Sequence, residues 1–229
     1  MCQAADVHEE PLLRRDPVSG GVTVLTMNRP DKRNALSIAL RDAISDALDD
    51  LGTDTDVKVV IITGAGPAFS AGFDLSEFER LDDPEHARRL WASSDRWHRT
   101  VLEFPLPLIA AVNGPALAGG FDLAIMCDVR VASISARFAH PEQTFSDVVY
   151  GPLHDAVGGA VARDLAMTGR PVDAEEALRL RLVTAVVPDA MDEARRLAAL
   201  VARAPRDVLM RTKAKAVRRA AVAGATLDL

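Results

Sequence analysis

A run of β-branched residues, Val57–Thr63 (VKVVIIT), limits the folds open to this chain more than any other segment. Apolar residues stand side by side in it, as in strands that are buried on both faces. Such strands belong to parallel sheets with helices on either side. A second apolar run, Pro107–Val112, has the same character. The two runs predict buried strands, and the alternation of strand and helix patterns around them, followed by a helical tail, predicts an α/β fold with a helical C-terminal extension.

Shorter patterns extend this prediction along the chain. Leu36, Leu40, Ile44 and Leu48 recur at helical spacing, with Arg41 away from the apolar face. No linker is long or polar enough to separate independent domains, so we expect an α/β core over residues 1–204 and a helical C-terminal segment over 205–229. The predicted strands are Val22–Met27, Val57–Thr63, Pro107–Val112, Val129–Ala132 and Thr184–Val187. The predicted helices are Leu36–Leu51, Pro84–Glu103, Ala118–Asp128, Ala156–Thr168, Asp173–Leu180, Met191–Ala204 and Pro205–Ala223, with Phe145–His154 irregular.

Charge and cysteine content exclude several classes of protein. The formal net charge of −6 argues against nucleic acid as the main partner. Cys2 and Cys127 do not form a disulfide framework, which indicates a reducing interior. No apolar stretch is long enough for a membrane span, and no signal core is seen near the N-terminus, so a cytoplasmic protein is expected.

Five basic residues cluster between positions 211 and 219. We interpret them as a solvated helix face, and the alternative is a local site for a phosphate-rich ligand. They are Arg211, Lys213, Lys215, Arg218 and Arg219.

Two glycine turns repeat one another after two predicted strands. Ala71-Gly72-Phe73-Asp74-Leu75 follows the first, and Gly119-Gly120-Phe121-Asp122-Leu123 follows the second. Glycine lets a ligand approach the backbone, and free N–H groups at a helix start favour negative charge. Facing one cavity, the turns would form an oxyanion hole. They would equally serve as ordinary strand-to-helix connections.

Other short motifs fit poorly. Gly64–Phe69 begins like a dinucleotide fingerprint but has Phe69 at the third glycine position. No Walker A sequence and no Gly-x-Ser-x-Gly elbow occur. His140-Pro141-Glu142 matches half of a zinc deaminase signature without its paired cysteines, so no metal site is predicted.

Several ordered segments together resemble the enoyl-CoA hydratase/isomerase (crotonase) family, from about Val22 to Arg211. The resemblance implies a spiral of ββα repeats that assembles as a trimer or a dimer of trimers. It also implies an acyl-CoA ligand, whose coenzyme A belongs to the substrate, so no separate cofactor is expected. The segments are Asn28–Leu36, Ile61–Phe78, Pro107–Ala132, Ser135–Glu142 and Thr168–Pro188.

The resemblance also assigns residues to the ligand. The N–H groups of Phe73 and Gly119 become the oxyanion donors. Phenylalanine at position 73, where the family often has alanine, should narrow the adjoining pocket. The residues expected to bind coenzyme A are Lys32, Arg33, Ala35, Ala71, Asp74 and Leu75.

Two acids take the positions that flank the substrate's α- and β-carbons in the family's hydratases. Glu142 is expected to exchange the proton at the α-carbon, and Asp122 to orient water. Asp122 is one methylene shorter than the family's usual glutamate and resembles the dienoyl-CoA isomerase branch. That branch has an aspartate where this chain has Tyr150, with Asp147 nearby.

The segment after Glu142 and the end of the chain also depart from the family pattern. His154 or Asp155 could enter the site, although a solvated loop is the simpler interpretation. The chain ends at Leu229, before the family's usual last helices. The sequence therefore does not show whether the chain forms the family's trimer.

The expected function is hydration of the 2,3 double bond of an enoyl-CoA. The alternatives are an enoyl- or dienoyl-CoA double-bond isomerase and a non-catalytic acyl-CoA-binding subunit. A hydrolase is disfavoured because neither glycine turn carries a serine nucleophile. Acyl length, branching and pathway do not follow from the sequence.

Overall fold

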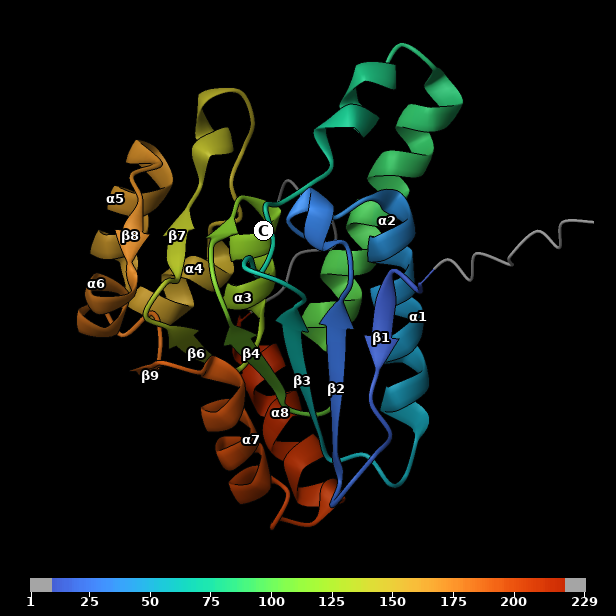
Figure 1. The fold of residues 1–229 in the computed structure, drawn as a ribbon, viewed down its shortest axis with the longest axis vertical. Coiled ribbons are helices and arrows are strands. Elements are labelled where there is room, and N and C mark those ends of the chain that lie inside the picture. Colours follow the sequence, from blue (N-terminus) through green and yellow to red (C-terminus); the bar gives the residue numbers. More distant parts are fainter. Residues whose placement is uncertain (1–9, 221–229) are drawn as a thin grey trace, which may run out of the picture.

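The computed structural model of the chain describes residues 10–220 and contains a six-stranded and a three-stranded sheet (Figure 1). The larger sheet has the order β1-β2-β3-β4-β6-β9. Its first pair is antiparallel and the other neighbours are parallel. The strands are β1 (Leu13–Arg15), β2 (Val22–Met27), β3 (Val59–Gly64), β4 (Leu108–Val112), β6 (Val129–Ser133) and β9 (Ala185–Val187). The predicted α/β class is therefore confirmed.

Side chains of β3 alternate between two apolar cores. Val60 and Ile62 pack into the larger core, which also contains residues of α1 (Ile38–Thr53), α2 (Pro84–Glu103) and α3 (Gly119–Met126). Val59 and Ile61 pack with alanines of α7 (Ala190–Val201) on the other face of the sheet. Burial on both faces explains why the strand carries no polar alternation.

The smaller sheet was not predicted as a separate unit. It consists of β5 (Ala116–Leu117), β7 (Arg137–Ala139) and β8 (Val172–Asp173), in that order. Its strands have two or three residues, too few for a period of two to be visible. β5 leads into α3, and β7 leads into the short helix η3 (Pro141–Thr144), so this sheet carries two segments of the site.

The predicted bounds of α2 are confirmed, but the segment after residue 150 differs from the prediction. The expected single helix Ala156–Thr168 is two helices, α4 (Gly151–Val157) and α5 (Gly159–Thr168). Gly158 between them has φ +78°, which interrupts the helical path. The segment Phe145–His154 was expected to be irregular, yet α4 begins within it, and Pro152 lies in the first turn of α4, where proline is tolerated. None of the helices in residues 10–220 is both long enough and apolar enough to cross a membrane.

The remaining short helix, α6 (Ala174–Arg179), precedes β9. The C-terminal helix α8 (Arg206–Ala220) is attached to the α/β core by side-chain hydrogen bonds. Arg206 donates to the carbonyls of Gly52 and Val57 at 2.6 and 3.0 Å. Lys213 is buried and its Nζ lies 2.6 Å from both carboxylate oxygens of Asp128. The basic run is thus not uniformly a solvated face, because Lys213 faces inward. The boundary between residues 204 and 205 stays a prediction.

Candidate active site

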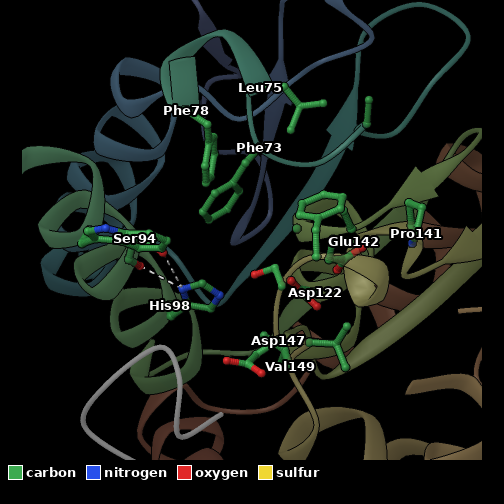
Figure 2. Close-up of a pocket in the computed structure, with 17 residues that line it drawn as sticks. Phe73, Leu75, Phe78, Ser94, His98, Asp122, Pro141, Glu142, Asp147 and Val149 are labelled. Carbon is green, nitrogen blue, oxygen red and sulfur yellow. Dashed lines mark hydrogen bonds between the residues drawn. The ribbon is translucent and has the colours of Figure 1, made fainter. Parts of the chain in front are cut away.

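A cavity of about 270 Å³ lies where the two glycine turns meet the smaller sheet (Figure 2). Its walls come from the first turn, one face of α2, the start of α3, and η3 with the loop after it. Most lining side chains are apolar, and the polar ones are few. The lining residues are Ala71, Phe73, Leu75, Phe78, Trp91, Ser94, His98, Ala118, Gly119, Asp122, Pro141, Glu142, Phe145, Ser146, Asp147, Val148 and Val149.

Backbone packing holds the two turns together. Gly72 has φ +88°, a conformation that side chains other than glycine's rarely permit. A Cβ atom there would lie 2.7 Å from the Ala118 Cβ and 3.1 Å from the Gly119 nitrogen. Only glycine at position 72 therefore lets the first turn lie directly against the second.

The predicted oxyanion donors, the N–H groups of Phe73 and Gly119, make no hydrogen bond within residues 10–220. Beside Phe73, the Leu36 N–H donates to the Gly72 carbonyl at 2.8 Å and the Asp74 N–H to the Leu36 carbonyl at 3.4 Å. The N–H of Phe73, which lies between these two hydrogen-bonding residues, takes no part in the pairing with Leu36. Both Phe73 and Gly119 line the cavity.

The start of α3 orients the Gly119 amide. The Ala118 carbonyl accepts hydrogen bonds from the N–H groups of Phe121 and Asp122 at 2.7 and 3.0 Å, so it points into the helix. In a trans peptide the next N–H points the opposite way, out of the helix end. Ala118 has φ +49°, a strained value for alanine. Strain of this kind is common where a site needs a fixed backbone direction.

Asp122 and His140, which are buried, and Glu142, which is half-buried, form a compact cluster at the cavity (Figure 2 labels the two acids). Asp122 lies in the first turn of α3, and Glu142 lies in η3. The His140 Nδ1 is 2.9 Å from Glu142 Oε1 and 3.7 Å from Asp122 Oδ1. Phe121 stacks on the imidazole, with ring centroids 4.5 Å apart. The predicted pair of acids is therefore brought together, with a histidine between them.

Burial changes the proton affinity of this cluster. It raises the pKa of Asp122 to about 7, with the Glu142 charge adding to the effect and His140 opposing it. Burial lowers the pKa of His140, but the hydrogen bond to Glu142 and the two carboxylate charges outweigh it, and the net pKa is raised. Asp122 Oδ1, His140 Nε2 and Glu142 Oε2 are buried without hydrogen-bond partners among the described residues. Groups of this kind can exchange protons near neutral pH.

The same cluster offers the one grouping of ligand atoms in residues 10–220 that a cation could use, with all atoms within 4.8 Å of one another. His140 Nδ1, however, already lies within hydrogen-bond distance of Glu142. We therefore describe the cluster by its proton-sharing contacts and assign no metal to it.

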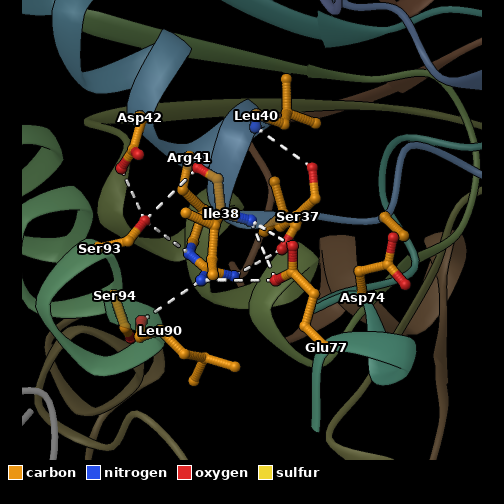
Figure 3. A network of polar contacts seen from close by, with 12 residues as sticks. Ser37, Ile38, Leu40, Arg41, Asp42, Asp74, Glu77, Leu90, Ser93 and Ser94 are labelled. Carbon is orange, nitrogen blue, oxygen red and sulfur yellow. Dashed lines mark hydrogen bonds and ion pairs between the residues drawn. The ribbon is translucent and has the colours of Figure 1, made fainter. Parts of the chain in front are cut away.

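A buried arginine, Arg41, contacts the first glycine turn and stands at the centre of a network of polar contacts (Figure 3). The Arg41 guanidinium lies 4.3 Å from the centre of the Phe73 ring and donates to the Leu36 carbonyl at 2.6 Å. Its Nη2 is 3.8 Å from Glu77 Oε2, in η2 (Leu75–Arg80), whose carboxylate accepts from the Ile38 N–H. Burial lowers the pKa of Arg41 to about 10. The sequence placed Arg41 away from the apolar face of its helix, yet the side chain is fully buried, because this network replaces its hydration.

The residues predicted to bind coenzyme A lie on two adjoining segments. Lys32 and Arg33, at the end of the short helix η1 (Pro30–Lys32), are exposed, and the Arg33 carbonyl accepts from the Ala71 N–H at 2.9 Å. Ala71 and Leu75 line the cavity, whereas Lys32, Arg33, Ala35 and Asp74 do not. Their contact with coenzyme A stays a prediction.

Asp74 has partners of its own. Burial raises its pKa, but hydrogen bonds from Ser76 and from Arg29, at 2.9 Å, hold the net pKa below its usual range. The carboxylate thus fixes the start of η2.

Of the residues considered after Glu142, the structure brings Asp147 alone to the cavity. Tyr150 stands at the start of α4, with its ring centroid 5.8 Å from that of His154. His154 Nδ1 is 3.6 Å from Asp155 Oδ1, and both are exposed.

Three kinds of residue at the site were missed from the sequence. His140 was noticed as part of a metal motif and set aside. Trp91, Ser94 and His98 recur at helical spacing in α2, and that spacing could have identified a shared face. The aromatic residues Phe78 and Phe145 gave no signal before folding placed them at the cavity.

Comparisons with known proteins agree with this geometry. The family model described as enoyl-CoA hydratase/isomerase matches residues 18–227. A Thermus thermophilus relative whose name places it among enoyl-CoA hydratases is 42% identical over 192 residues, which cover 80% of this chain and 76% of the relative.

Two solved structures show the same likeness. The enoyl-CoA hydratase from Bacillus anthracis superposes with a TM-score of 0.86 at 31% identity, over 93% of this chain and 85% of that one. A monofunctional enoyl-CoA isomerase from M. smegmatis superposes with a TM-score of 0.79 at 30% identity, over 93% of this chain and 95% of that one. Similar chains therefore carry hydratase names and isomerase names.

Proposed function

Because the chain belongs to the enoyl-CoA hydratase/isomerase family and has its crotonase-like α/β fold, we propose that it adds water across the 2,3 double bond of an enoyl-CoA. The observation that supports this reaction is the pair of acids at the cavity, Asp122 and Glu142, joined by His140. Moving a double bond needs one group that carries a proton between two carbons. Adding water needs a base for the water and an acid for the α-carbon, which two carboxyl groups supply.

In the proposed reaction the thioester carbonyl oxygen accepts hydrogen bonds from the N–H groups of Phe73 and Gly119. The water oxygen forms a bond to the β-carbon, and the electron pair of the double bond passes through the α-carbon to the carbonyl oxygen. Each preorganised donor can lower the barrier by about 3 kcal/mol. The unpaired state of both amides within residues 10–220 supports this role.

The proton balance involves the buried cluster. Asp122 orients the water and accepts its proton, and Glu142 delivers a proton to the α-carbon as the enolate collapses. His140 contacts both acids, so the proton can return from one to the other without leaving the cluster. A carboxyl whose pKa is about 7 can both take and return a proton at neutral pH.

The test is hydration of crotonyl-CoA, followed as loss of the enoyl-thioester absorbance. We expect turnover by the wild type and a fall of at least about 100-fold in kcat for Asp122→Asn and for Glu142→Gln. A 3-enoyl-CoA supplied in parallel would reveal isomerisation. Turnover of that substrate alone would replace the proposal with an isomerase. Binding of acyl-CoA with neither reaction would indicate a non-catalytic subunit.

Assembly and surroundings are part of the same proposal. An acyl-CoA thioester is the proposed ligand, a homotrimer or hexamer the proposed assembly, and the cytoplasm the proposed location. Sedimentation of the purified chain would test the assembly.

A further inference from the structure

One histidine of the cavity has no part in the proposed hydration. His98 lies on the inner face of α2, one and two turns beyond Ser94 and Trp91, and all three line the cavity. Its side chain is deeply buried, since 2% of the residue is exposed. Figure 2 shows the imidazole turned toward the side of the cavity where Asp122 lies.

Its hydrogen bonding identifies the tautomer. The Nδ1 of His98 is 2.9 Å from the backbone carbonyl of Ser94, and a carbonyl can only accept, so Nδ1 carries the proton. Burial lowers the pKa of His98 to about 4, and the nearby Arg41 charge acts in the same direction. The ring is therefore neutral at pH 7, and Nε2 presents a lone pair.

That lone pair lacks a partner in the described part of the chain. Nε2 is buried and accepts no hydrogen bond from any residue between 10 and 220. Most of the cavity wall is apolar, with Phe73, Phe78, Trp91 and Val148, and no lining residue donates a hydrogen bond to Nε2. A buried acceptor without a donor is unfavourable, so a ligand that brings a donor to this point gains affinity over one that does not.

We propose that His98 is a specificity-determining residue whose Nε2 accepts a hydrogen bond from a hydroxyl group on the acyl chain. The preferred thioesters then carry a hydroxyl beyond the β-carbon, and plain hydrocarbon acyl groups bind more weakly. This inference rests on the proposed function, because Asp122 and Glu142 are taken to hold the α- and β-carbons.

The experiment measures binding and needs no turnover. Saturated ω-hydroxyacyl-CoA thioesters with four to six acyl carbons are each compared, by calorimetry, with the acyl-CoA in which a methyl replaces the hydroxyl. We expect the wild type to bind at least one hydroxyl thioester about tenfold more tightly than its methyl partner. His98→Phe should bring this ratio to about one.

Two further variants separate the hydrogen bond from folding. His98→Gln can place a carboxamide oxygen near the Nε2 position and should keep part of the preference. Arg89→Gln changes an exposed residue of the same helix and should leave the ratio unchanged. Because each ratio is taken within one variant, a general loss of affinity cancels.

The outcomes are separable. A ratio of one in the wild type, or an unchanged ratio in His98→Phe, overturns the inference even if crotonyl-CoA is hydrated. A tenfold ratio that depends on His98 supports it even if no enoyl-CoA is hydrated, in which case the proposed reaction alone fails. If neither thioester binds, both fail.

Discussion

At the scale of a single residue, Asp122 makes the free energy of unfolding depend on pH. Its pKa rises from an ordinary value of 3.8 to about 7 in the folded protein because the carboxyl is buried. A carboxyl with a raised folded pKa contributes stability below its unfolded pKa, and this is lost as pH rises through 7. We expect the unfolding free energy of Asp122→Asn, relative to wild type, to grow by about 2–3 kcal/mol between about pH 5 and about pH 8.5.

Urea denaturation at the two pH values measures this difference. Asp83→Asn is the matched control, since Asp83 is an exposed helix cap whose pKa is lowered by the backbone hydrogen bonds from Glu85 and His86. Its carboxylate is ionised in both states across this range, so its difference should stay constant. A constant difference for Asp122→Asn as well would show that the acid is not buried as described.

His140 gives a second prediction at this scale. Asparagine can donate from nearly the same point as His140 Nδ1, whereas leucine cannot, so only His140→Asn keeps a donor for Glu142. We expect His140→Leu to reduce kcat for crotonyl-CoA by about 100-fold, through displacement of Glu142, and His140→Asn to lose at least tenfold less. Equal losses would show that the donor does not position Glu142, and urea denaturation would control for folding.

The positions of site residues at the cavity were predictable from sequence only where a motif named them. Asp122 and Glu142 were predicted by the family resemblance, and the structure places them in one cavity. His98 and Arg41 were not, because helical spacing marks a polar residue as outward-facing unless a buried partner is known. Their partners, Ser94 within the helix and Glu77 from a distant segment, become visible only in the folded chain.

At the scale of the elements, Arg41 links α1, α2 and η2, so its replacement should reduce the stability of their packing. Its guanidinium is fully buried and donates to the carbonyls of Leu36 and Leu90. We expect Arg41→Met to lower the free energy of unfolding by about 3 kcal/mol, because buried acceptors lose their donor. Arg96→Met removes an exposed pair with Asp46 and Asp49 and should cost less than about 1 kcal/mol. Similar urea midpoints for the two variants would contradict this account.

Elements were predicted best where a pattern is long. The strand Val22–Met27 and the helix Pro84–Glu103, of six and twenty residues, have the predicted bounds. β5 and β8 have two residues each, so no periodicity can indicate them. They form because the smaller sheet pairs segments far apart in sequence, as Phe138 pairs with Val172.

At the scale of the whole molecule, Lys213 attaches the last helix to the core. Its side chain is 5% exposed and lies against Asp128, which also accepts from the Leu108 N–H at 2.8 Å. We expect Lys213→Met to lower the unfolding free energy by about 2 kcal/mol and to speed hydrogen exchange in α8. Arg211→Met, in an exposed pair with Asp207 on the same helix, should change stability by less than about 0.5 kcal/mol. Unchanged exchange in Lys213→Met would show that α8 is held by other contacts.

The α/β class was predicted from the alternation of strand and helix patterns, and the spiral of ββα repeats was predicted from the family resemblance. The contact between α8 and the core could not be predicted, because Lys213 and Asp128 lie far apart in sequence. Residues 221–223 of the predicted last helix lie outside the described residues.

The two tryptophans of the chain give it a built-in optical reporter. Trp97 is fully enclosed beside Phe73, whereas Trp91 is 43% exposed and lines the cavity. An acyl chain that covers Trp91 should shift its emission to shorter wavelength while Trp97 stays constant. Fluorescence can therefore count occupied sites without a label, and the signal should vanish in Trp91→Phe.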